Sequence, residues 1–303
     1  MNIGLALSGG GVKGATHIGV LQALEENEVK ISTISGTSIG SIVASLYAMG
    51  YTTDEMLKLF KYFAKTILKT DPKYLISNIR TKRSIFGEGI ISGQAIEDAI
   101  NECAKLKNIK FIKDIIMPIA IPTVDIKTGK EIIFTNANIS NEYIPENEVE
   151  GEYLAKPKED VPEYITDIEI GKAVRASCSY PVVFSPLEYE NYKFVDGGVL
   201  NNIPANELRK LGAEKVITVK FGITEAPNIN GSLDILFRCI DLVFDDRDSR
   251  KILKSDYILN VDVSASSLFD IKKIDYCYNR GYLAAMREMY DIKEAVKERR
   301  KRM

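Results

Sequence analysis

The stretch ISGTSIGSIVA places a serine in the sequence surroundings of a nucleophile. It contains G-x-S-x-G, with Ser38 between Gly36 and Gly40, and this spacing is typical of a sharp strand-to-helix turn that exposes the serine oxygen. A conventional serine hydrolase pairs its serine with a histidine. Among the 303 residues of this chain there is one histidine, His17. The first question is therefore which group takes the proton from Ser38.

A second candidate element is the glycine-rich run S-G-G-G-V-K-G near the N-terminus, where Gly9, Gly11 and Gly14 satisfy G-x-G-x-x-G. A dinucleotide fold needs an acidic residue at the end of the next strand, and the sequence there, ISTISGTS, has none. A phosphate-binding P-loop is excluded because Lys and Ser or Thr do not follow Gly14. Consecutive glycines can also turn backbone N–H groups toward an oxyanion. A tight turn without a ligand is the alternative.

The third element is D-G-G-V-L-N-N-I-P, which begins at Asp196. A carboxylate here ends an apolar strand, and Gly197 and Gly198 would let another chain segment approach closely. Taken alone, Asp196 is as well suited to capping a turn as to catalysis.

Together these elements, in this order and at this spacing, resemble the patatin-like phospholipase family. A fourth block, A-S-C-S-Y-P-V-V-F-S-P from Ala176 to Pro186, is similar to the family's stretch before the D-G-G strand. The resemblance covers about residues 1–220 and is loose beyond residue 222. It implies a patatin-like, three-layer α/β/α fold with a mostly parallel central sheet.

The resemblance also implies a catalytic dyad in place of a triad. By matching motifs, the assigned residues are the nucleophile Ser38, the base Asp196, the oxyanion-hole glycines Gly9, Gly10 and Gly11, and the supporting glycines Gly36, Gly40, Gly197 and Gly198. The family commonly has a histidine at the position of His17 without using it as the base, so we expect a structural role for it. A carboxylate with an ordinary pKa is a weak base for a hydroxyl, so Asp196 must contact Ser38 directly.

The implied reaction is the hydrolysis of carboxylic esters of acyl lipids, including phospholipids and lysophospholipids, through an acyl-enzyme. The family uses no metal, and we expect no cofactor. A general esterase or thioesterase of the same fold is one alternative. An inactive lipid- or nucleotide-binding module is another.

The elements that must position these motifs alternate between strand and helix patterns, which predicts a mostly parallel sheet covered on both faces. The expected strands are 2–7, 29–35, 117–125, 131–135, 193–195, 215–220 and 257–263. One expected helix begins directly after the glycine loop, and the others are 38–49, 53–68, 93–106, 205–210, 233–253 and 279–297.

With 45% hydrophobic residues the chain can bury a substantial core, and we expect one domain over residues 1–303. Its motif-bearing core is about 1–220, and residues 222–303 form a C-terminal helical part. Residues 141–169 carry ten acidic side chains, two lysines and three prolines, so we predict a surface insertion there.

Charge and cysteine content limit the kinds of partner and the compartment that we expect. The formal net charge of −2 does not favour binding to nucleic acid. The four widely separated cysteines fit a reducing, cytoplasmic environment and do not suggest a metal site. No leader or membrane-spanning run is visible.

Residues 58–83 carry eight basic side chains and one acidic one among aromatic and aliphatic residues. We hypothesise that this segment makes peripheral contact with anionic lipid; a solvated helix packed on the sheet is the alternative. The oligomeric state is not indicated.

Overall fold

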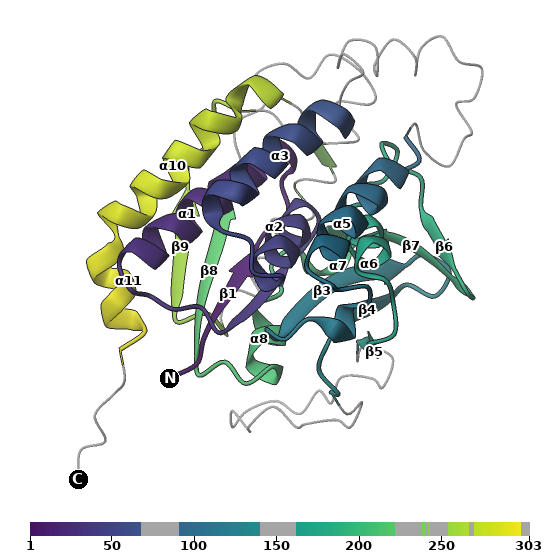
Figure 1. Ribbon diagram of the computed structural model, residues 1–303, viewed down its shortest axis with the longest axis horizontal. Helices are drawn as coiled ribbons and strands as arrows, with labels where there is room; N and C mark the ends of the chain where they lie inside the picture. The colour runs from purple at the N-terminus through teal and green to yellow at the C-terminus, as the bar shows by residue number, and fades with distance from the viewer. Residues whose placement is uncertain are drawn as a thin grey trace.

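The computed structural model describes residues 1–67, 91–139, 162–221, 254–266 and 270–297, with four isolated residues between 235 and 242. Nine strands of this described part form one sheet in the order β5-β4-β3-β2-β1-β8-β9, with β7 paired to β3 and β6 to β7 (Figure 1). The strands are β1 (Ile3–Leu7), β2 (Thr33–Gly36), β3 (Ile119–Asp125), β4 (Lys130–Thr135), β5 (Glu163–Ile165), β6 (Leu187–Tyr189), β7 (Tyr192–Asp196), β8 (Lys215–Phe221) and β9 (Tyr257–Val261).

The centre of the sheet is parallel. β3, β2, β1, β8 and β9 run in one direction, whereas β4 and β7 lie antiparallel to β3. β1 is buried along its whole length, as expected of a strand covered on both faces. The sequence-based expectation of a mostly parallel central sheet is confirmed.

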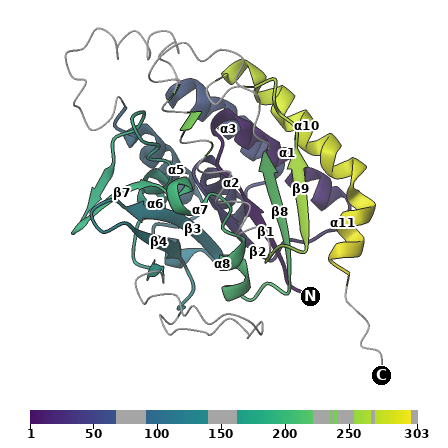
Figure 2. The ribbon, with the colours of Figure 1, turned by 180° about the vertical axis from the view of Figure 1, so that it is seen from behind.

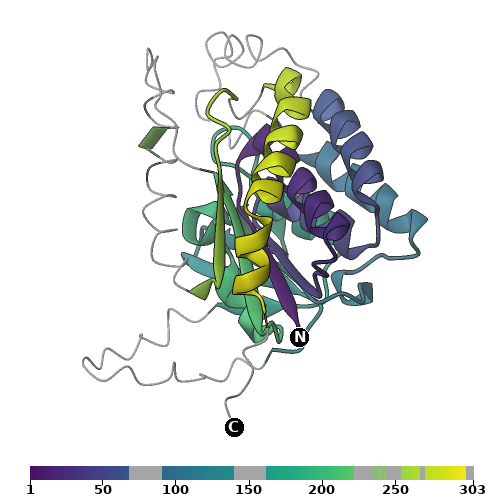
Figure 3. The same ribbon diagram turned by 90° about the vertical axis from the view of Figure 1, so that its left-hand side faces the viewer.

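Helices cover the sheet in two layers of unequal size. The larger layer packs the main hydrophobic core against the sheet. Its helices are α1 (Ala15–Glu26), α2 (Ile39–Ala48), α3 (Thr53–Ile67), α5 (Gln94–Leu106), α6 (Ile170–Ser177), α10 (Ile274–Arg287) and α11 (Met289–Ala295). On the other face, α8 (Ala205–Lys210) packs a second small core onto β1 and β8, and α7 (Gly198–Asn201) precedes it. In Figure 3, α1, α3 and α10 lie on one side of the sheet and α8 on the other. Among the described residues, no helix combines the length and the apolar composition needed to cross a bilayer.

One edge of β3 is shared by two strands. β2 pairs with β3 at Ile119 and Ala120, whereas β7 pairs with it at Thr123 to Asp125. Since β4 occupies the opposite edge of β3, β7 continues the row that β2 leaves at Gly36. β7 runs antiparallel to β3, so its last residue, Asp196, points back toward the end of β2. Three residues of β3 span about 10 Å, which sets the distance between the two strand ends.

The structure corrects several expected boundaries. The second strand begins at Thr33 and not at residue 29, because its register with β1 starts with Thr33 opposite Gly4. The predicted C-terminal helix is two helices, α10 and α11, which meet at Glu288. Residues 163–165 belong to the sheet as β5, so the surface insertion predicted for 141–169 ends earlier than expected. Most of the insertion, the predicted helix 233–253 apart from isolated residues, and residues 68–83 lie outside the described residues.

Two glycines let α1 and α10 approach each other closely. A Cβ added at Gly19 would lie 2.1 Å from the carbonyl oxygen of Tyr278, and one added at Gly281 would lie 2.1 Å from that of Thr16. Both distances are far below a van der Waals contact. Figures 1 and 2 show α10 running along α1. The C-terminal helix therefore packs backbone to backbone on the helix that follows the glycine loop.

We expect Gly281→Ala to lower the free energy of unfolding by about 1–3 kcal/mol, because the added methyl must push α10 away from α1. Chemical denaturation measures the change. Leu283→Ala is the control on the same helix, since Leu283 is 61% exposed and its truncation should change stability by less than about 0.5 kcal/mol. If the helices were less closely packed, alanine would stabilise α10 by up to about 1 kcal/mol over glycine, and this result would contradict the prediction.

Candidate active site

Ser38 stands on the turn between β2 and α2 in a conformation that few residues adopt. Its φ is 54° and its ψ is −126°, and its side chain is half-buried. A Cβ added at Gly36 would lie 2.2 Å from the carbonyl oxygen of Gly40, and one added at Gly40 would lie 2.6 Å from that of Leu7, so the turn has no room for a side chain at either glycine. Backbone strain of this kind persists only where surrounding contacts hold it.

Two serines hold the turn. The backbone N–H of Ser38 donates to the hydroxyl oxygen of Ser177 at 2.9 Å, and the hydroxyl of Ser41 donates to the carbonyl oxygen of Ser38 at 2.6 Å. Ser177 is fully buried at the end of α6. Ser177 lies in the A-S-C-S block of the sequence, but sequence spacing does not reveal a hydrogen bond between residues 139 positions apart.

Asp196 ends β7 and is 1% exposed. Its backbone N–H donates to the carbonyl oxygen of Ser179 at 3.0 Å, and its Oδ1 accepts the N–H of Gly198 at 2.8 Å. Its other carboxyl oxygen, Oδ2, has no hydrogen-bond partner within the described chain. One oxygen of the carboxyl group is thus held in place and the other remains able to accept a proton.

Burial raises the pKa of Asp196 to about 7. The nearby Ser38 side chain and the Gly198 amide oppose this rise, because each favours the ionised carboxylate. Ser38 is therefore close to Asp196, yet Oδ2 makes no hydrogen bond of ordinary geometry, so we regard the contact as looser than a formed bond. Such contacts commonly tighten only when substrate binds. The raised pKa makes Asp196 a stronger base than an ordinary aspartate.

A thiol lies beside these two residues. Sγ of Cys178 is 3.8 Å from Oγ of Ser41, and the side chain is 5% exposed. Burial and the neighbouring Asp196 carboxylate raise the pKa of this thiol well above its usual range. Cys178 therefore remains protonated and is a poor nucleophile.

The glycine loop lies against Ser38. A Cβ added at Gly9 would be 3.2 Å from the Cβ of Ser38, and Gly10 and Gly11 have positive φ angles of 151° and 58°. The N–H of Gly9 donates to Oδ1 of Asn202 at 2.9 Å, so this amide already has an acceptor. Gly10 and Gly11 are left as the candidate oxyanion donors, and Gly9 shapes the loop. Asn202 belongs to the D-G-G-V-L-N-N-I-P motif, whose spacing alone does not predict this contact.

The His17 side chain is directed to the start of the glycine loop. Its Nε2 is 2.8 Å from the carbonyl oxygen of Ser8, and its ring stacks on Phe221 with centroids 4.8 Å apart. Burial lowers the pKa of His17 to about 4, although the Ser8 carbonyl opposes this change. Neither ring nitrogen bonds to Ser38 or Asp196, and Nδ1 has no partner within the described part of the chain. This agrees with the expectation of a structural histidine.

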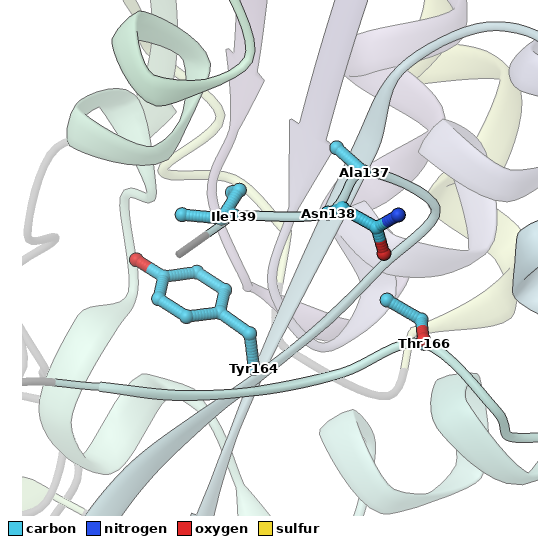
Figure 4. A pocket seen from close by; sticks show the side chains of 5 residues that line it. All are labelled: Ala137, Asn138, Ile139, Tyr164 and Thr166. Atoms are coloured by element: carbon cyan, nitrogen blue, oxygen red, sulfur yellow. The ribbon is translucent and has the colours of Figure 1, made fainter. Parts of the chain in front are cut away.

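A shallow pocket of about 320 Å³ opens at the other end of the sheet. Figure 4 shows Tyr164 facing Ile139 and the Asn138 side chain directed toward Thr166. These residues lie near the end of β4 that pairs with the start of β3. Asp196, in contrast, pairs with the second half of β3. The pocket is therefore separate from the Ser38 site.

Comparisons with known proteins agree with the motifs. A model of the family described as "Patatin-like phospholipase" matches residues 5–209. This chain belongs to the patatin-like phospholipase family. The matched span includes the glycine loop, Ser38 and Asp196, and it ends before α10.

Individual relatives differ in length from this patatin-like chain. A lysophospholipase of Meyerozyma guilliermondii is 28% identical over 225 residues, which is 73% of this chain and 12% of the relative. A probable lipid hydrolase of Invertebrate iridescent virus 6 is 32% identical over 203 residues, 66% of this chain and 61% of the relative. Among solved structures, VipD from Legionella pneumophila has 15% identity and a TM-score of 0.49, covering 96% of this chain and 67% of VipD. The chain thus spans less than two thirds of the length of the two sequence relatives.

The raised pKa of Asp196 predicts a pH-dependent cost in stability. The Asp196 carboxyl has a pKa of about 7 in the folded state and 3.8 in the unfolded state, so its proton stabilises the folded state. This stabilisation is complete below pH 3.8 and is lost as the pH rises through 7. Asn cannot ionise. We expect the stability of Asp196→Asn relative to wild type to increase by about 2–3 kcal/mol between pH 5 and pH 8.

Chemical denaturation at several pH values measures this difference. Asp98→Asn is the matched control because Asp98 is exposed on α5. Parallel pH profiles for wild type and Asp196→Asn would show that the buried carboxyl has an ordinary pKa.

Proposed function

We propose that this chain is a serine lipid acyl hydrolase that cleaves carboxylic esters of phospholipids or lysophospholipids. The observation that carries the proposal is the buried Asp196, whose Oδ2 accepts no hydrogen bond in the described chain while its carboxyl group lies close to the strained Ser38. Family membership and the printed names of the relatives, a lysophospholipase and a probable lipid hydrolase, support acyl lipids as the substrate class.

In the first half-reaction the Ser38 oxygen attacks the ester carbonyl carbon while its proton passes to Oδ2 of Asp196. The carbonyl oxygen becomes an oxyanion, for which the Gly10 and Gly11 amides are the proposed donors. The tetrahedral intermediate collapses when the C–O bond to the alcohol breaks, and the alcohol leaves with the proton from Asp196. An acyl-enzyme on Ser38 remains.

In the second half-reaction water attacks the acyl-enzyme and gives a proton to Asp196. The ester bond to Ser38 then breaks, Ser38 recovers its proton from Asp196, and the fatty acid is released. A base with a pKa of about 7 suits both directions of this transfer near neutral pH, because it can accept and return a proton at little cost.

Labelling with a fluorophosphonate probe tests the proposal. We expect wild type to label and Ser38→Ala to lose labelling entirely, while Asp196→Asn should label at least about 100-fold more slowly, as expected for the loss of a general base. The wild-type rate should rise with pH through about 7 as Asp196 ionises. Ser45→Ala is the matched control, since Ser45 is buried on the same helix and its hydroxyl has no partner in the described chain.

A wild type that does not label would favour an inactive lipid- or nucleotide-binding module. Equal labelling of Ser38→Ala would place the nucleophile elsewhere. A general esterase or thioesterase remains the alternative within enzymes, and turnover of phospholipids, lysophospholipids, short-chain esters and thioesters distinguishes these classes.

We infer further that residues 1–303 act as one catalytic domain. The close backbone contact of α10 with α1 supports this inference, because the C-terminal part packs on the helix that follows the glycine loop. A chain ending at residue 221 should then fail to give a cooperative unfolding transition.

Peripheral contact with anionic lipid through residues 58–83 stays a proposal. On α3 the apolar side chains Met56, Phe60 and Phe63 are buried in the core, and Lys61 pairs with Asp275 at 2.5 Å. Within the described part of this segment, binding would therefore depend chiefly on the exposed lysines Lys58 and Lys65.

We expect Lys58→Glu together with Lys65→Glu to weaken binding to vesicles that contain anionic phospholipid by about 30-fold or more, since each of the two basic residues contributes about 1 kcal/mol near such a surface. Sedimentation with vesicles measures the change. Reversal of two exposed lysines on other elements, Lys30 and Lys105, serves as the control. If the Lys58/Lys65 variant and the Lys30/Lys105 variant bind these vesicles equally well, α3 does not face the membrane.

A further inference from the structure

The single histidine of the chain is fully buried at the start of α1 and takes no part in the proposed proton transfer. Nε2 of His17 lies 2.8 Å from the carbonyl oxygen of Ser8. A carbonyl oxygen can only accept, so Nε2 must carry the proton. The neutral imidazole is thus the Nε2–H tautomer, and its bare Nδ1 has no partner within the described residues.

The group that His17 holds belongs to the first peptide unit of the glycine loop. That unit contains the carbonyl of Ser8 and the N–H of Gly9, which lie in one plane. The carbonyl accepts from His17, and the N–H donates to Asn202 at 2.9 Å. Two side chains, one from α1 and one from the segment that follows Asp196, therefore fix the same peptide plane from its two sides.

The aromatic ring of Phe221 completes this support. It stacks on the imidazole of His17 at 4.8 Å, and it fills the space beside Gly10, where an added Cβ would lie 2.7 Å from the ring. The N–H of Ser8 is also bound, to the carbonyl of Val219 at 3.2 Å. The chain is therefore held just before the loop and packed against a ring at Gly10.

Successive glycines would otherwise leave the loop free to take many conformations. The Gly10 and Gly11 amides can stabilise an oxyanion only if they are already aimed at the position where charge develops. The plane between Ser8 and Gly9 gives the loop a fixed start, and the Phe221 ring limits the space beside Gly10, so together they restrict where those amides point.

We propose that His17 is a positioning residue, whose Nε2–H group orients the oxyanion loop by holding the Ser8 carbonyl. This inference rests on the proposed hydrolase function and goes beyond it by giving the histidine a role distinct from that of a base. It predicts that the hydrogen-bond donor at this position matters and that the basicity of the ring does not.

Two variants separate these properties. In His17→Gln the side-chain amide places an N–H donor near the position of Nε2, but it cannot act as a base. In His17→Leu the apolar volume is kept and the donor is lost. With a chromogenic short-chain ester as substrate, we expect His17→Leu to lower kcat about 10- to 100-fold with KM within about twofold, and His17→Gln to lie within about fivefold of wild type.

Other outcomes overturn the proposal. Wild-type kcat in His17→Leu would mean that only packing matters at this position. Losses of about 1,000-fold or more in both variants would indicate that the ring acts as a base, and equal smaller losses would show that the donor is irrelevant.

A measurement on the unmutated protein does not depend on the folding of either variant. Because His17 is the only histidine, nitrogen NMR of tag-free protein reports its tautomer directly. We expect the Nε2–H form at pH 7 and a change in the Nε2 resonance when a fluorophosphonate reacts with Ser38. An Nδ1–H or doubly protonated ring, or no change on labelling, would overturn the proposal. If the protein does not label at all, the hydrolase function fails, while the tautomer still tests the contact with Ser8.

Discussion

The site depends on the way in which two strands divide one edge of β3. β2 pairs with the first residues of β3 and then leaves the sheet at the Ser38 turn, and antiparallel β7 pairs with the remaining residues of the same edge. A parallel strand in this place would bring its first residue, and not its last, toward Ser38. The antiparallel direction of β7 therefore brings Asp196, 158 positions away in the sequence, toward Ser38.

The segment after Asp196 then fastens the other two elements. The hydroxyl of Thr37 donates to the carbonyl oxygen of Asn201 at 2.8 Å, and Oδ1 of Asn202 accepts the N–H of Gly9. A little further on, the hydroxyl of Ser35 donates to the carbonyl oxygen of Pro204 at 3.0 Å. These contacts are buried or partly buried, where the low local dielectric makes a hydrogen bond stronger than it is in water. The D-G-G motif thus supplies a carboxylate and also a frame for the elbow and the glycine loop.

Much of this could be predicted from the sequence, because the motifs are local. Spacing and small residues marked the turn around Ser38, and alternating apolar segments gave the parallel sheet. The roles of Ser177 and Asn202 could not be predicted, since each hydrogen bond joins residues more than 130 positions apart. The raised pKa of Asp196 was missed for the same reason: it follows from burial, which arises only when the chain folds. Boundaries failed where apolar residues such as Val29 and Ile31 are buried without pairing as strand.

The contact between Gly281 and Thr16 joins the C-terminal helices to the surroundings of the glycine loop. Thr16 precedes His17, so α10, which lies beyond the family-matched span, rests directly on the backbone next to the residue that holds the glycine loop. A rigid contact of this kind transmits displacement instead of absorbing it. A force on the outer surface of α10 is therefore passed to the backbone beside His17, and through the Ser8 carbonyl to the start of the glycine loop.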